Sequence, residues 1–107
     1  MTVQEWIAAR TPPPPVALQE GVRTALGDDA SAPVELTAEA CLRAAVRELR
    51  AILDARRFDR PGALDLLVVD ALTTYAYEYA GGAGGADLVR VAEEGLRRLG
   101  TLAASNG

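Results

Sequence analysis

The stretch "LDLLVVDALTTYAYEYAGGAGG", residues 64–85, decides the fold of this chain. It is mostly apolar, it shows no alternation of period two, and a glycine cluster ends it. On a helix of about 100° per residue, most of its large apolar side chains gather on one side, which we expect to face the core. These residues are Leu64, Val68, Ala71, Leu72, Tyr75 and Tyr79. The segment therefore predicts a central helix over about 61–80.

Four further helices are predicted from the same periodicity, at about 3–10, 15–26, 38–57 and 87–103. The apolar stripe expected on the third helix comprises Ala38, Cys41, Leu42, Ala45, Leu49, Ile52 and Leu53. The stripe expected on the last comprises Leu88, Val91, Ala92, Leu96, Leu99 and Leu102. We therefore predict an all-α fold, a compact bundle of three longer helices (38–57, 61–80 and 87–103) with the two short N-terminal helices packed across it.

The chain of 107 residues fits one helical domain, 1–107, with an N-terminal arm over 1–30 and a main bundle over 31–104. Within the arm, Thr2 and Glu5 have the spacing of a capping box, and Trp6 is expected to anchor the first helix to the body. A proline-rich spacer covers 12–15. Gly27 is a natural stop for the second helix.

Glycine and capping residues give further local signals. Gly21 lies inside the second predicted helix and argues against it, because glycine costs about 1 kcal/mol there relative to alanine. Thr37 and Asp59 are expected to cap the third and fourth helices. Cys41 falls on an apolar stripe, so we expect a buried and inert thiol.

Composition excludes several kinds of chemistry. The chain has no histidine and one cysteine, so Ser-His-Asp and Cys-His sets and thiolate clusters are ruled out, and we expect no metal and no cofactor. Catalysis by carboxylates alone or by tyrosine stays open. The net charge of −4 argues against nucleic-acid binding. The N-terminus lacks the pattern of a secretory signal, and acids interrupt the longest apolar stretch, so we expect no membrane span and a cytoplasmic location.

Acids within the apolar stretch are its least ordinary feature. Asp65 is expected in the first helical turn, where a carboxylate interacts favourably with the helix dipole. Asp70 has three competing interpretations: a solvated or arginine-paired edge, a polar group in a self-association interface, and the anchor of a small-molecule pocket.

The side of the central helix away from the core suggests a function. It carries leucines that would be exposed to water without stabilising the fold if nothing covered them. We therefore predict a non-enzymatic interaction or oligomerisation module whose partner is the chain itself or another protein. The predicted partner-binding residues are Leu66, Leu67, Asp70, Thr74 and Tyr77. The alternative is a small-molecule or lipid-binding protein with a pocket around Asp70, Tyr75 and Tyr79. A candidate electrostatic stripe comprises Arg43, Arg47, Arg50 and Arg57. It would contact a charged protein partner or, in a third and less favoured alternative, an anion or a nucleic acid.

One short segment, "DALTTYAYE" at 70–78, resembles a helix of the polyprenyl synthases, which carry a similar D-A-L-L-x-x-A-F-E stretch. The resemblance covers nine residues of 107, and the aspartate-rich D-D-x-x-D motifs that bind diphosphate through magnesium in that family are absent. No function is carried over from it.

Overall fold

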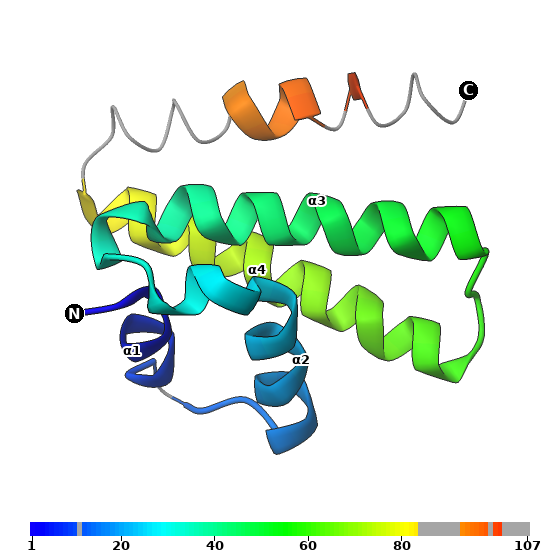
Figure 1. Cartoon of the computed structure of the whole chain (residues 1–107), viewed down its shortest axis with the longest axis horizontal. Coiled ribbons are helices and arrows are strands. Elements are labelled where there is room, and N and C mark those ends of the chain that lie inside the picture. The colour runs from blue at the N-terminus through cyan, green and yellow to red at the C-terminus, as the bar shows by residue number, and fades with distance from the viewer. Residues whose placement is uncertain (11, 84–92, 99, 102–107) are drawn as a thin grey trace.

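The fold is built on a hairpin of two long helices, α3 (Thr37–Ala55) and α4 (Arg60–Ala83), which run antiparallel and pack side by side (Figure 1). In this computed structural model the described residues are 1–10, 12–83, 93–98 and 100–101. Within them the regular secondary structure is helical throughout, apart from a single β-bridge between Thr2 and Pro33. The predicted all-α fold with a central fourth helix is therefore confirmed.

The N-terminal elements cover one side of this hairpin. They are α1 (Val3–Ala8), α2 (Val16–Leu26) and the short 3-10 turns η1 (Gly27–Ser31) and η2 (Val34–Leu36). Residues 93–98 and 100–101 are also helical and lie along α3 on the other side (Figure 1). The rest of the helix predicted over 87–103 lies outside the described residues. The turn that joins α3 to α4 extends past α1 and α2.

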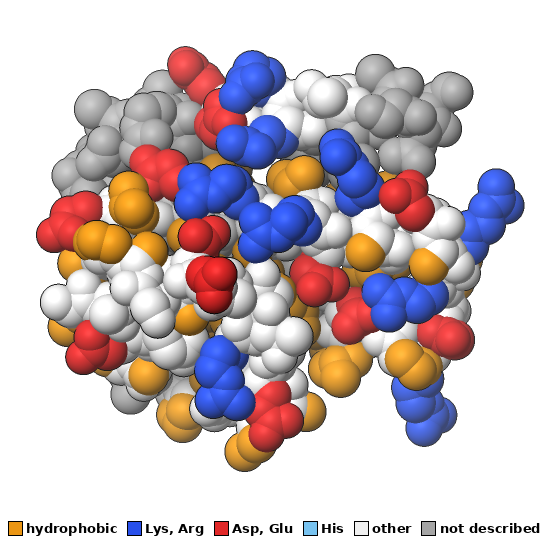
Figure 2. Space-filling model, viewed as in Figure 1, with side chains coloured by type: hydrophobic (Ala, Val, Ile, Leu, Met, Phe, Trp, Pro, Cys, Tyr) orange, Lys and Arg blue, Asp and Glu red, His pale blue; other side chains and the backbone are white. Residues whose placement is uncertain are grey.

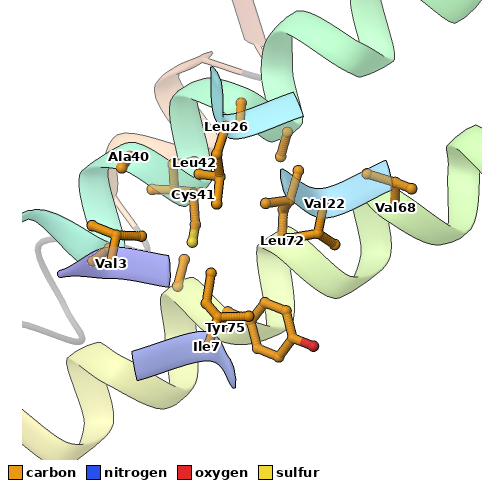
Figure 3. Packing of buried hydrophobic residues seen from close by; sticks show 14 of the residues in the cluster. Val3, Ile7, Val22, Leu26, Ala40, Cys41, Leu42, Val68, Leu72 and Tyr75 are labelled. Atoms are coloured by element: carbon orange, nitrogen blue, oxygen red, sulfur yellow. The ribbon is translucent and has the colours of Figure 1, made fainter. Parts of the chain in front are cut away.

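The core lies where α1, α2, α3 and α4 meet, and Figure 3 shows side chains from all four helices pointing into it. On α4, Val68, Leu72 and Tyr75 are buried as predicted. Leu64 is instead 40% exposed, because the first turns of α4 lie beyond the part of the hairpin that α2 covers. Leu53, 36% exposed near the end of α3, departs from the predicted stripe at the same end of the hairpin.

The expectation for Leu96 is also wrong. The helical periodicity places this leucine on the apolar side of the last helix, yet it is 71% exposed. Its neighbour Gly95 is buried instead, and a Cβ at that position would lie 3.3 Å from the hydroxyl of Tyr77 and 3.9 Å from Cδ2 of Leu42. The backbone at Gly95 therefore approaches α3 and α4 closely, where a larger residue would hold it away.

The capping residues predicted from the sequence are confirmed at three helix ends and are wrong at one. The backbone N–H of Glu5 donates to the Thr2 hydroxyl (3.1 Å), and the Thr2 N–H donates to the Glu5 carboxylate (2.9 Å), which completes the capping box. The Gly62 N–H donates to Asp59 (3.0 Å), and Gly27 ends α2 with a φ of 55°. Thr37 does not cap α3: it is the first helical residue, and its hydroxyl donates to the Val34 carbonyl (2.6 Å).

Trp6 attaches α1 to α4, as its position predicts. Its ring meets those of Tyr75 and Tyr79 edge to face, with centroids 6.4 and 5.4 Å apart. Such pairs add about 0.5–1.5 kcal/mol beyond the area that they bury. The Arg10 guanidinium lies 4.4 Å from the centroid of the Trp6 ring. A six-residue helix is thus held by aromatic contacts.

Gly21, which argued against a helix, is explained by the packing of α2 on α4. A Cβ at this position would lie 2.6 Å from Cγ2 of Val68, closer than real side chains approach each other. The glycine lowers the intrinsic stability of α2, but it lets the two backbones come together.

Replacing Gly21 with alanine should therefore lower the free energy of unfolding by about 1–2 kcal/mol, although alanine is the better helix former. Val68 is β-branched and only 3% exposed, so it has little freedom to move away from the new methyl group. In urea denaturation, the double variant Gly21→Ala/Val68→Ala should lose less free energy of unfolding than the sum of the losses caused by Gly21→Ala and Val68→Ala alone. A Gly21→Ala protein at least as stable as its parent would contradict this account.

Candidate functional site

Exposed apolar side chains concentrate around the turn between α3 and α4. Among the described residues nine large hydrophobic side chains are exposed, and five of them fall between positions 53 and 67. These five are Leu53, Phe58, Leu64, Leu66 and Leu67. Phe58 is 73% exposed and Leu67 is 56% exposed, so this end of the hairpin presents far more apolar surface than an isolated leucine would.

The outer side of α4 is a continuous exposed stripe. Ala63, Leu67, Asp70 and Thr74 are all exposed and follow one another at intervals of four, three and four residues. This spacing places them in one line along the helix, opposite the buried Leu72. We call these four residues the α4 stripe. Leu66, 45% exposed, flanks it.

Tyr77 differs from the other four predicted partner-binding residues because it is not exposed. It is half-buried and packs against the core, and with Leu42, Leu49, Val69 and Gly95 it lines a small apolar groove of about 60 Å³. The C-terminal helical residues cover this part of α4, which the periodicity of α4 alone could not reveal. Of the five predicted residues, four are exposed: Leu66, Leu67, Asp70 and Thr74.

The three residues of the alternative pocket are not brought together. Tyr75 is buried and lies at the edge of the core close to Trp6, with its hydroxyl directed away from the cluster (Figure 3). Desolvation, with a smaller contribution from Glu78, raises the pKa of Tyr75 above its ordinary value. Tyr79 also contacts Trp6, whereas Asp70 is exposed nine residues earlier, on the opposite side of α4.

The three acids of the apolar stretch have three different environments. Asp65 is not in the first turn, because α4 begins at Arg60; it forms an ion pair with Arg57 (2.9 Å), so the helix-dipole interpretation is wrong. Glu78 pairs with Arg10 (3.1 Å), which links α4 to the end of α1. Asp70 is exposed and has no ion pair within the described part of the chain.

Three of the four arginines in the candidate electrostatic stripe form ion pairs or hydrogen bonds within the chain. Arg43 pairs with Asp29 at 3.5 Å, and Arg47 donates to the Ala25 carbonyl at 3.0 Å, so both hold η1 and the end of α2 against α3. Arg57 lies in the turn after α3 and pairs with Asp65, while Arg50 is exposed. On the face seen in Figure 2, acidic side chains accompany the arginines.

Cys41 lies at the centre of the core with its sulfur directed into the cluster (Figure 3). Burial raises the pKa of this thiol to about 12, so it carries almost no thiolate at neutral pH. The prediction of a buried thiol is confirmed, and the low thiolate fraction makes it inert as a nucleophile.

Among the described residues, no group of three or more acidic, cysteine or histidine side chains is placed to hold a metal ion. None of their helices is long and apolar enough to cross a membrane. The α4 stripe and the flanking Leu66 form an exposed surface that the packing of the described residues does not explain.

Comparison with models of protein families, with curated proteins and with solved structures finds no match to this chain.

Proposed function

We propose that this chain is a non-enzymatic protein–protein interaction module that contacts its partner through the α4 stripe and the flanking Leu66. The single observation that carries the proposal is the exposure of Leu66 and Leu67, 45% and 56%, on a helix whose opposite side is buried at Val68 and Leu72. Covering apolar surface contributes about 25 cal/mol per Å². Two adjacent leucines are therefore a favourable centre for a contact.

Polar groups around the leucines suit a protein partner. Asp70 is exposed, and its backbone carbonyl accepts a hydrogen bond of 2.9 Å from the Thr74 hydroxyl. Apolar centres with a polar rim are typical of protein interfaces. We further propose a cytoplasmic setting, because the one cysteine is free and the chain needs no disulfide.

Site-specific photo-crosslinking tests this proposal. With the photoreactive residue p-benzoylphenylalanine in place of Leu67, a discrete covalent adduct should form in cells that express the chain. Val16 is the matched control, because it is 69% exposed and apolar but lies on α2. Replacing Leu66 with aspartate should reduce the Leu67 adduct several-fold, since a charge at the edge of the contact opposes burial.

Equal labelling at Leu67 and Val16, or no adduct at either, would contradict the proposal. An adduct between two copies of the chain and an adduct with a different protein both support it.

A further inference from the structure

We infer that the partner for the α4 stripe is a second copy of this chain, packed antiparallel against α4 around a twofold axis close to residue 65. The inference rests on the proposed function and names its partner. It comes from the order of charged, small and large side chains along the exposed side of α4.

Two opposite charges flank the apolar part of this side. Arg60 and Asp70 are both exposed, and neither forms an ion pair within the described part of the chain. They are ten residues apart, which on a helix is about 15 Å. They are too far apart to neutralise each other within one chain.

A second pair, Ala63 and Leu67, lies between these charges on the same side. Residue 65 is the midpoint of Ala63 and Leu67, and it is also the midpoint of Arg60 and Asp70. A twofold axis at this level therefore places Leu67 against the partner's Ala63 and Arg60 against the partner's Asp70. Each contact occurs twice, because a twofold interface is isologous.

Both contacts are complementary. Leu67 projects from the helix, whereas Ala63 leaves a shallow gap that a leucine fills, as large and small residues alternate in packed helices. Arg60 and Asp70 are of opposite sign, so each end of the contact gains an ion pair. A parallel arrangement in register would set Arg60 against the partner's Arg60 and Asp70 against the partner's Asp70, which is repulsive.

The contact covers about three helical turns, so the buried area is at the low end of protein interfaces and the dimer should be weak and concentration-dependent. Sedimentation velocity on the full chain over a wide concentration range provides the test. The sedimentation coefficient of the parent chain should rise with concentration toward that of a dimer.

Charge exchange makes the test specific. Arg60→Asp and Asp70→Arg should each weaken self-association about tenfold or more, because both ion pairs become repulsive. An equimolar mixture of these two variants should form a heterodimer, since aspartates of one chain then face arginines of the other. The double variant Arg60→Asp/Asp70→Arg should regain self-association. Glu20→Arg, an exposed acid on α2, is the control and should behave as the parent chain does.

A parent chain that stays monomeric at every concentration would overturn the inference, and so would a mixture that associates no better than its components. These outcomes are separable from failure of the proposed function. If crosslinking at Leu67 captures a different protein while the isolated chain stays monomeric, the interaction surface stands and the self-association is rejected. If crosslinking at Leu67 fails, both are rejected.

Discussion

Replacing Leu72 with alanine should lower the free energy of unfolding by about 2–5 kcal/mol, the range for truncating a buried leucine. Leu72 is fully buried in the middle of α4, where side chains from α2 and α3 surround it (Figure 3). Close packing leaves little freedom to collapse into the space, so the loss includes a cavity term as well as the lost burial. Urea denaturation followed by far-UV circular dichroism measures it.

Leu67→Ala is the matched control, since it makes the same substitution on the same helix five residues earlier. Leu67 is 56% exposed, so its truncation should change the free energy of unfolding by about 0.5 kcal/mol or less. Both variants should be compared at a concentration where the chain is monomeric. Equal effects at the two positions would show that the assignment of core and outer sides of α4 is incorrect.

Gly62→Ala should destabilise the chain by about 3 kcal/mol, at the upper end of the cost of overpacking. A Cβ at Gly62 would lie only 1.9 Å from the backbone carbonyl oxygen of Arg57. This backbone is fixed by the hydrogen bond from the Arg57 N–H to the Ile52 carbonyl and by the left-handed conformation of Arg56 (φ 52°). A carbonyl held in this way cannot rotate aside as a long side chain can.

The same substitution at Gly81 provides the contrast. Gly81 is also on α4, but a Cβ there would meet nothing within 4 Å in the described part of the chain. Gly81→Ala should therefore raise the free energy of unfolding, by up to about 1 kcal/mol, through helix propensity alone. If Gly62→Ala also stabilised the chain, the tight approach of α4 to the preceding turn would be refuted.

Helix order and most caps were predictable because they depend on neighbouring residues. The capping box of Thr2 and Glu5 and the stop at Gly27 are examples. Close approaches between helices could not be predicted from the sequence, because they depend on residues far apart in the chain. Gly21 against Val68 and Gly95 against Tyr77 are both of this kind: a Cβ at Gly21 would clash with Val68, and a Cβ at Gly95 would crowd the Tyr77 hydroxyl.

The candidate site was predictable to the same extent. Helical periodicity alone places Leu67 and Asp70 on the outer side of α4. It cannot show that the C-terminal helical residues cover Tyr77, nor that Arg57 in the preceding turn reaches Asp65. The side of a helix is encoded locally, whereas what covers it is encoded by the rest of the chain.

The proline run before α2 helps to explain why the short helix α1 stays docked on the rest of the fold. Prolines 12–15 have a fixed φ whether or not α1 is docked, so this part of the chain loses little conformational freedom on docking. A helix of six residues is not stable alone, and a flexible connection would make its attachment costlier still. The run thus stabilises the N-terminal arm by restricting the detached state, without contributing a hydrogen bond from its own amides.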